Sequence, residues 1–189
     1  MDWTSAPVIV TCLALLVPTV VDVFLRHRYA AGGGERDEGT ARRLIVSLNL
    51  NTLVLFALPS FGIASFDEPR ALMSFGALLC VLGVAVRYVA IFRLGRLFTW
   101  RVAILDGHAL QTAGLFRWIR HPSYAGGILA MIGAALAFGS WGALLFFVST
   151  HVPVLLQRIR VEERVLASTF GEAWERYAAH TSRLVPFVW

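Results

Sequence analysis

The chain has 189 residues, of which 57% are hydrophobic, and its formal net charge is +5. This composition excludes an ordinary soluble domain of this size and indicates a small integral membrane protein. All 17 basic residues are arginines that lie around apolar runs, so membrane topology and lipid headgroups explain them better than a nucleic-acid partner does. The two cysteines lie inside apolar runs without metal-type spacing, which predicts neither a disulfide nor a metal site.

Five apolar runs follow one another along the chain and predict an all-α integral membrane protein with about five transmembrane helices. A helix needs roughly 20 apolar residues to cross the hydrocarbon of a bilayer. Three runs meet this length, and two shorter ones, separated only by Gly139 and Ser140, predict a tight C-terminal helical hairpin. The runs are Ala6–Leu25, Leu44–Phe66, Ala71–Phe92, Tyr124–Phe138 and Trp141–Gln157.

The distribution of arginine predicts the orientation of these helices. The first connector, the third connector and the segment after Gln157 carry five arginines each, whereas the second connector carries one and the fourth none. By the positive-inside rule, the N-terminus then lies outside and the C-terminus in the cytoplasm. The absence of lysine and the many alanines favour a bacterial source, hence an inner (plasma) membrane location.

The first of three unusual polar stretches is LDGHALQTAGLFRW, which begins at Leu105. Its DG and AG dipeptides mark turns, so we expect His108 on a loop beside the membrane. A solvated surface histidine and a ligand-binding histidine both fit this position.

The second stretch, RWIRHPSYAGG, stands directly before the fourth apolar run. Pro122 suits the first turn of a helix, and it biases His121 away from the helical conformation. Gly126 and Gly127 allow another backbone or a ligand to approach closely. A helix start explains Pro122 but does not ask for imidazole, so His121 and Tyr124 indicate a ligand site.

The third stretch, LLQRIRVEERVLASTFG, predicts an amphipathic helix that carries a carboxylate in its apolar face. Glu162 lies in the middle of that face, Arg158 borders it one turn earlier, and we expect Glu163 to be solvated at its edge. Two interpretations stay open: a weak Arg158–Glu162 pair on an exposed helix, or two ligand-binding groups. The apolar face consists of Leu155, Ile159, Leu166 and Phe170, and Arg160 and Arg164 point away from it.

Together the three stretches resemble the isoprenylcysteine carboxyl methyltransferase family and its prokaryotic relatives. That family has a His-x-Leu-Val-Thr-x-Gly-x-Tyr segment, an Arg-His-Pro-Ser-Tyr-x-Gly segment, a helical hairpin and a Glu-Glu pair before Phe-Gly. The resemblance covers roughly Arg93 to the C-terminus. The matching residues are His108, Leu110, Thr112, Gly114, Arg120, His121, Pro122, Ser123, Tyr124, Gly126, Glu162, Glu163, Phe170 and Gly171.

The resemblance implies a membrane methyltransferase that binds S-adenosyl-L-methionine without a Rossmann domain. The implied acceptor is a lipophilic small molecule or a lipid-modified group, methylated on a carboxylate at the cytoplasmic face of the membrane. Arg158 is the implied catalytic residue, which binds the acceptor. The implied cofactor-binding residues are His108, Leu110, Gln111, Phe116, His121, Pro122, Ser123, Tyr124 and Glu162, with Gln111 and Phe116 standing where the family has Val and Tyr.

The chain is thus expected to divide into two regions. Residues 1–92 form a three-helix membrane region, in which Asp22 and Arg87 lie near a membrane boundary and Arg87 reaches toward the interface. Residues 93–189 form the catalytic region, with a cofactor-binding connector, the hairpin and a cytoplasmic C-terminal helix.

Other functions fit parts of the pattern. An amine-headed phospholipid or a thiol could replace the carboxylate as methyl acceptor, although either would have to lose a proton. An NAD(P)H-dependent membrane reductase of the sterol-reductase type has Asn after Pro and an acid after Gly, where this chain has Ser123 and Gly127. A non-catalytic membrane scaffold would leave Glu162 in its apolar face unexplained.

Overall fold

The computed structural model describes residues 3–28, 37–65, 70–99, 102, 104, 107 and 109–186, and for 26–28 only the backbone. Across these ranges the chain is helical and contains no strand, which confirms the predicted all-α fold. The α-helices are α1 (Ala6–Arg28), α2 (Thr40–Ser60), α3 (Arg70–Leu94), α4 (Pro122–Ala137), α5 (Trp141–Phe170) and α6 (Glu172–Ala179). Two 3₁₀ turns, η1 (Gly95–Leu97) and η2 (Gly114–Arg117), lie between α3 and α4.

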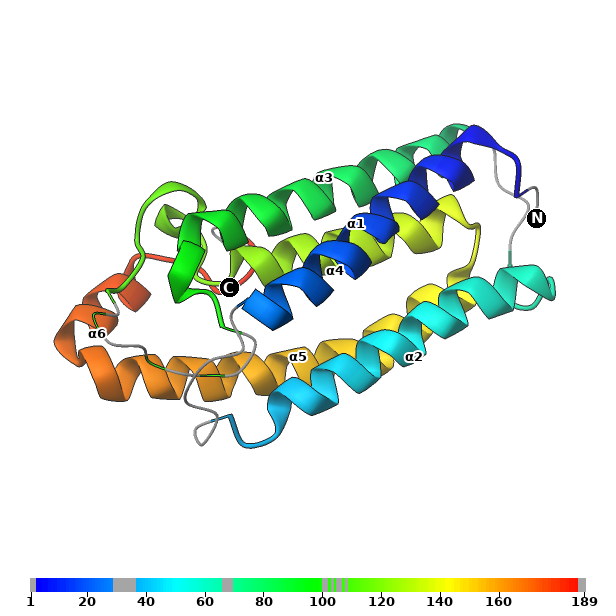
Figure 1. The fold of residues 1–189 in the computed structure, drawn as a ribbon. Helices are drawn as coiled ribbons and strands as arrows, with labels where there is room; N and C mark the ends of the chain where they lie inside the picture. The colour runs from blue at the N-terminus through cyan, green and yellow to red at the C-terminus, as the bar shows by residue number, and fades with distance from the viewer. Residues whose placement is uncertain are drawn as a thin grey trace.

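The first five helices run back and forth along one axis, so the N-terminus lies at one end of the bundle and α6 at the other (Figure 1). Four of them, α1, α2, α3 and α5, are long and apolar enough to cross a membrane. The fifth, α4, has 16 residues and rises only about 24 Å, less than the roughly 30 Å of a hydrocarbon core. The predicted hairpin is confirmed, because only Gly139 and Ser140 separate the C-cap of α4 from α5.

Helix α5 continues past the expected fifth span without a break. Its 30 residues include the whole stretch from Leu155 to Phe170, and they rise about 45 Å. The side chains of Arg158 and Glu162 therefore project from the C-terminal half of one long helix. Gly171, at φ 50°, ends α5 and turns the chain into α6.

Glycines bring α3 and α4 unusually close together. A Cβ atom added to Gly83 would lie 2.6 Å from the Gly126 carbonyl oxygen, and one added to Gly126 would lie 2.6 Å from the Gly83 carbonyl oxygen. Gly76 and Gly133 make the same kind of contact two helical turns away. A Cβ atom added to Gly76 would lie 2.7 Å from the Gly133 carbonyl oxygen, and one added to Gly133 would lie 2.6 Å from the Gly76 carbonyl oxygen. Since no side chain fits between these backbones, small residues fix the α3–α4 packing, as is common in membrane helices.

A largely buried ion pair attaches α1 to α3. Arg87 Nη2 donates to Asp22 Oδ2 at 2.9 Å, and the Tyr88 hydroxyl donates to Asp22 Oδ1 at 2.8 Å. Both oxygens of this buried carboxylate are thus satisfied. The guanidinium of Arg87 thus turns toward a carboxylate of α1.

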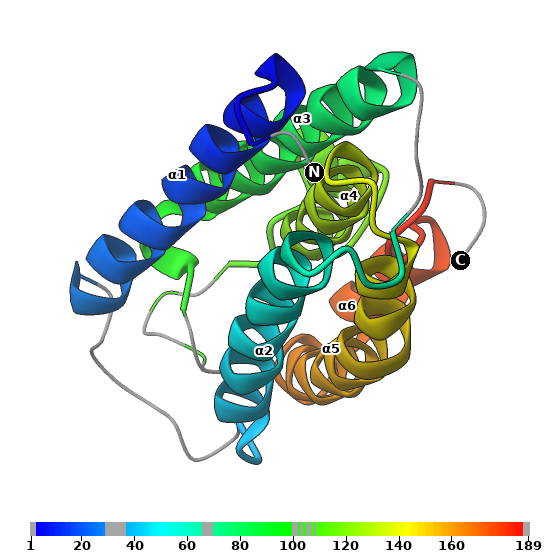
Figure 2. The same cartoon turned by 90° about the vertical axis from the view of Figure 1, so that its right-hand side faces the viewer.

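Polar contacts also join α2 to α5. Asn51 Nδ2 donates to Thr150 Oγ1 at 3.0 Å, and Ser47 Oγ lies 3.1 Å from His151 Nδ1. Seen along the bundle, α4 lies between the α1–α3 pair and the α2–α5 pair (Figure 2). Helix α4, which the second polar stretch opens, therefore packs against α3, α5 and α1.

We predict that Gly126→Ala lowers the free energy of unfolding by about 2 kcal/mol, because the added methyl meets backbone on α3 that cannot move aside. Its neighbour provides the control: a Cβ on Gly127 would have Arg87 Nη1, at 4.0 Å, as its nearest contact. Gly127→Ala should therefore change stability by less than about 1 kcal/mol, in the stabilising direction. Denaturant unfolding in detergent micelles measures both, and equal losses would contradict the close α3–α4 contact.

Candidate functional site

The second polar stretch forms the start of α4 and pairs with the C-terminal segment. His121 is the N-cap of α4 and Pro122 its first residue, as expected. The backbone N–H groups of Arg120 and His121 donate to the carbonyls of Ser182 and Arg183 at 2.8 and 3.0 Å. A segment more than 60 residues away in sequence thus holds the entrance of α4 in place.

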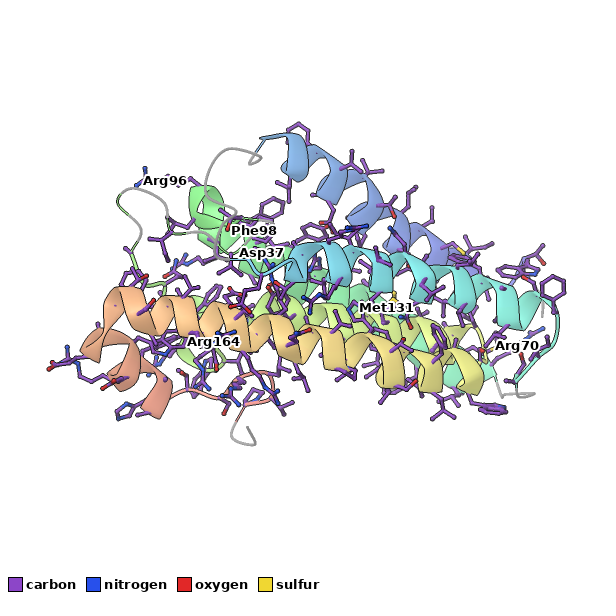
Figure 3. All side chains as sticks on the ribbon, turned by 90° about the horizontal axis from the view of Figure 1, so that it is seen from below. Asp37, Arg70, Arg96, Phe98, Met131 and Arg164 are labelled. Atoms are coloured by element: carbon purple, nitrogen blue, oxygen red, sulfur yellow. The ribbon has the colours of Figure 1, made fainter. Side chains whose placement is uncertain are left out.

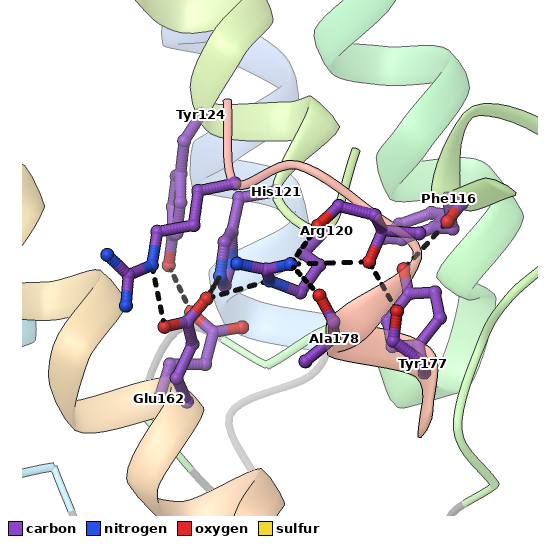
Figure 4. A network of polar contacts seen from close by, with 10 residues as sticks. Phe116, Arg120, His121, Tyr124, Glu162, Tyr177 and Ala178 are labelled. Atoms are coloured by element: carbon purple, nitrogen blue, oxygen red, sulfur yellow. Dashed lines mark hydrogen bonds and ion pairs between the residues drawn. The ribbon is translucent and has the colours of Figure 1, made fainter. Parts of the chain in front are cut away.

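Glu163 joins these two segments to α5. Its Oε1 accepts from Arg120 Nε at 2.9 Å and lies 3.4 Å from His121 Nε2, while Oε2 accepts from Arg183 Nε at 2.9 Å (Figure 4). The prediction that Glu163 is solvated is therefore wrong, since its side chain is only 13% exposed. The apolar periodicity of α5 shows which face of the helix is apolar, but it does not show that the C-terminal segment with Arg183 covers the edge of that face, where Glu163 lies.

Tyr124 occupies the space between Glu162 and Arg158. Its hydroxyl donates to Glu162 Oε2 at 2.8 Å and accepts from Arg158 Nε at 3.3 Å, and its ring stacks on His121 with centroids 5.6 Å apart. Figure 4 shows Tyr124 and His121 side by side above Glu162. The interpretation of Arg158 and Glu162 as a weak pair on an exposed helix does not describe this site, because the Tyr124 hydroxyl bridges them.

Asp37, just before α2, completes the surroundings of Arg158. Its carboxylate accepts from the backbone N–H groups of Ala41 and Val102 at 3.0 and 3.1 Å and pairs with Arg158 Nη1. Burial raises the pKa of Asp37, but these hydrogen bonds and the charge of Arg158 outweigh it and hold the pKa below its usual range. Figure 3 shows Asp37 near Phe98, between the start of α2 and the segment that follows α3.

The first polar stretch lies against the same region, although His108 lies outside the described residues. Gln111 Nε2 donates to the Arg93 carbonyl at 3.3 Å, and Phe116 is buried in η2. The Tyr177 hydroxyl donates to the Phe116 carbonyl at 2.7 Å. Burial raises the pKa of Tyr177 to about 12 although the charge of Arg120 opposes this, so the hydroxyl keeps the proton that it donates.

Many of these side chains line one cavity, which lies at the end of the bundle where α6 is found. Its volume is about 130 Å³, measured as the space open to the centre of a water-sized sphere. Eight predicted site residues line it, and Pro122 is buried beside it as the first residue of α4. The eight are Leu110, Gln111, Phe116, His121, Ser123, Tyr124, Arg158 and Glu162.

Several residues of this site are not evident from the sequence. Trp174 and Tyr177 of α6 line the cavity, and their spacing of three residues on one helix face is the only signal for them. Asp37 carries no such signal, because the sequence around it reads as a charged, glycine-rich connector. Its contact with Arg158 depends on the pairing of α2 with α5, which sequence periodicity does not reveal.

Residues 76–168, from the middle of α3 almost to the end of α5, match the isoprenylcysteine carboxyl methyltransferase (ICMT) family. Over this segment the chain is similar to that family. The match includes the glycine-packed α3–α4 pair, the RHPSY stretch and both glutamates of the candidate site. The resemblance drawn from the sequence is thereby confirmed.

Named relatives extend the similarity beyond that segment. The chain is 32% identical to protein-S-isoprenylcysteine O-methyltransferase A of Arabidopsis thaliana over 61% of its own length and 59% of the relative. It is 30% identical to protein-S-isoprenylcysteine O-methyltransferase of Saccharomyces cerevisiae over 70% of this chain and 57% of the relative. The chain therefore spans less than two thirds of the length of these ICMT relatives.

A solved structure supports the same fold. The eukaryotic intramembrane Ras methyltransferase ICMT superposes with a TM-score of 0.59 and 25% sequence identity, over 76% of this chain and 52% of that one. The bundle described above is thus the ICMT membrane fold.

We predict that Glu163→Gln costs about 2–4 kcal/mol of stability, because it leaves Arg120 and His121 without a buried carboxylate. The matched control is Glu38→Gln, which makes the same chemical change in the Glu38–Arg164 pair, where both side chains are more than half exposed. That control should cost less than about 1 kcal/mol. Thermal unfolding compares the two, and equal losses would show that Glu163 does not join the segments as described.

Proposed function

We propose that this protein is an S-adenosyl-L-methionine-dependent methyltransferase that acts on the carboxylate of a lipophilic acceptor at the membrane. The observation that carries this proposal is the position of Glu162. Its carboxylate accepts a hydrogen bond from Tyr124 in a cavity that residues of all three family-like stretches line. The match of residues 76–168 to the ICMT family and the names of similar proteins support the reaction class.

The residues present fit this cofactor. S-adenosyl-L-methionine carries an ammonium and a sulfonium cation, for which Glu162 offers a carboxylate, and an adenosine, for which Gln111 and Ser123 offer polar groups. Leu110 and Phe116 add apolar surface on the same wall. Such a mixture of apolar surface with a few polar groups is typical of small-molecule sites.

When bound, the cofactor would supply a sulfonium-activated methyl group to an ionised carboxylate oxygen of the acceptor, and its sulfur would keep the electron pair of the broken carbon–sulfur bond. No general base is required, so the protein has to orient its two ligands and exclude water. His121 and Tyr124 form a stacked wall against which the ligands are held. Arg158, a planar and permanently charged group, hydrogen-bonds the acceptor's carboxylate.

The acceptor we propose is a lipophilic or lipid-modified acid that reaches the cavity from the bilayer. Apolar side chains from three helices line this cavity: Leu44 of α2, Leu94 of α3 and Leu166 of α5. The arginine distribution supports a cytoplasmic position for this end of the bundle, with Arg96 and Arg164 near it and Arg70 at the opposite end (Figure 3). We propose a bacterial inner membrane as the location, with the N-terminus outside.

Isothermal titration with S-adenosylhomocysteine tests the cofactor. The purified wild type should bind it, and Glu162→Gln should weaken binding by about tenfold or more, the cost of one charge-assisted hydrogen bond. Glu175→Gln, on the exposed face of α6, is the matched control and should leave the affinity unchanged. No binding to the wild type, or a thermal shift with NADPH instead, would overturn the proposed function in favour of a scaffold or a reductase.

The role of Arg158 has a separate test. Arg158→Lys should raise the KM for a farnesylcysteine analogue by about tenfold, because an ammonium cannot reproduce the planar donors of guanidinium. The affinity for S-adenosylhomocysteine should stay within about twofold of wild type. Arg160→Lys, two residues away on the exposed face of α5, should change neither value. An unchanged KM in Arg158→Lys would show that Arg158 does not bind the acceptor.

A further inference from the structure

Two side chains that the proposed function assigns to different ligands lie about one helical turn apart on α5. Glu162 is assigned to a cation of the cofactor and Arg158 to the carboxylate of the acceptor, and residues four apart on a helix can form a direct ion pair. Their opposite charges already attract each other. Arg158 is only 3% exposed, so solvent screens this attraction weakly. A direct pair would satisfy each group with the other and weaken the binding of both ligands.

The Tyr124 hydroxyl bridges the two groups but contacts only one nitrogen of the guanidinium. It accepts from Arg158 Nε at 3.3 Å and donates to Glu162 Oε2 at 2.8 Å. Nε is the nitrogen nearest the aliphatic part of the arginine side chain, so other contacts have to hold the outer end of the group, where Nη1 lies. Because an arginine side chain has many rotamers, those contacts decide where the guanidinium is placed.

The entrance of α2 holds this outer end. Arg158 Nη1 donates to Thr40 Oγ1 at 3.0 Å and pairs with the Asp37 carboxylate. The Thr40 hydroxyl in turn donates to the Asp37 carbonyl at 2.8 Å, which leaves its lone pairs to accept from the guanidinium. Asp37 and Thr40 are 4% and 1% exposed, so water competes little with these hydrogen bonds.

The α2 entrance is itself fixed from several directions. Asp37 Oδ2 accepts from the Ala41 N–H at 3.0 Å in the first turn of α2, and Oδ1 accepts from the Val102 N–H at 3.1 Å. Val102 belongs to the connector after α3 and lines the cavity. Arg43 Nη1 donates to Gln157 Oε1 at 2.9 Å and joins the first turns of α2 to α5. The two acceptors for the guanidinium are therefore held at a defined place.

We propose that Asp37 and Thr40 are positioning residues that keep Arg158 from pairing directly with Glu162, so that each of these two charges binds its own ligand. This inference rests on the proposed function. Neither positioning residue is among the described residues that line the cavity, so both act on the acceptor through Arg158. Both also precede residues 76–168, the segment that matches the family.

The experiment measures KM for N-acetyl-S-farnesylcysteine at saturating S-adenosylmethionine, with the full-length protein in detergent micelles. Asp37→Asn is compared alone and in combination with Glu162→Gln, which removes the charge toward which Arg158 would move. Asparagine has a single acceptor oxygen, so Asp37→Asn loses a backbone hydrogen bond as well as the ion pair with Arg158. The structural effect of that loss is present in both backgrounds and cancels in the comparison.

Asp37→Asn should raise KM about tenfold while Glu162 is present, and by less than about threefold in the Glu162→Gln background, because only the first leaves a carboxylate with which Arg158 can pair. The difference between these two increases is the decisive quantity. An equal increase in both backgrounds, or no increase while Glu162 is present, overturns this inference.

Thr40→Val is a second variant, and it changes no charge. It removes the hydroxyl that accepts from Arg158 and should raise KM about threefold, again only while Glu162 is present. Thr52→Val is the matched control, because it removes a hydroxyl of the same helix that donates to the Leu48 carbonyl at 2.9 Å. This control should leave KM unchanged.

Titration with S-adenosylhomocysteine separates this inference from the proposed function. In Asp37→Asn its Kd should rise about threefold, because Arg158 then competes with the ligand for Glu162. A wild type that does not bind the compound overturns the proposed function itself. Binding by the wild type, combined with equal KM increases in the two backgrounds, overturns only the positioning role of Asp37 and Thr40.

Discussion

The backbone contact between α3 and α4 is the constraint on which the site depends. Because Gly83 and Gly126 leave no room for a side chain, the two helices have one possible separation and register at this level. That register places Arg87 beside the first turns of α4, and thereby opposite α5. The same contact holds the entrance of α4, with His121 and Tyr124, deep within the bundle, where Glu162 and Glu163 can reach it. Neither interaction of the glutamates would form if α4 stood a side chain's width further away.

The arginines that line the cavity each form an ion pair with a carboxylate. Arginine supplies every formally cationic side chain of the cavity lining, yet none of these arginines acts there as an unopposed cation, because a carboxylate from α1, α5 or the α2 entrance stands behind each. Removing either partner of such a pair leaves a buried charge uncompensated, which is far more costly than removing both. The N-terminal helices, whose sequence suggested only membrane anchoring, therefore take part in the electrostatics of the site.

The sequence predicted those features that depend on local periodicity or on a contiguous motif. The helical hairpin, the N-cap position of His121 and the apolar face around Glu162 are of this kind, and eight of the ten predicted site residues meet around one cavity. The inward turn of Arg87, the burial of Glu163 and the role of Asp37 were not predicted. Each depends on a contact between segments distant in sequence, namely α1 with α3, the C-terminal segment with α5, and the α2 entrance with α5. A single amphipathic pattern shows which face is apolar but not which neighbour covers its edge.

The pairing of Arg120 and His121 with Ser182 and Arg183 has a consequence for biosynthesis. The five long helices α1 to α5 all precede these two residues in the sequence. The wall of the cavity that these residues hold, however, cannot close until the polypeptide has been made at least as far as position 183. A chain that ended before position 183 would therefore retain α1 to α5 but lack the backbone partners that hold the entrance of α4.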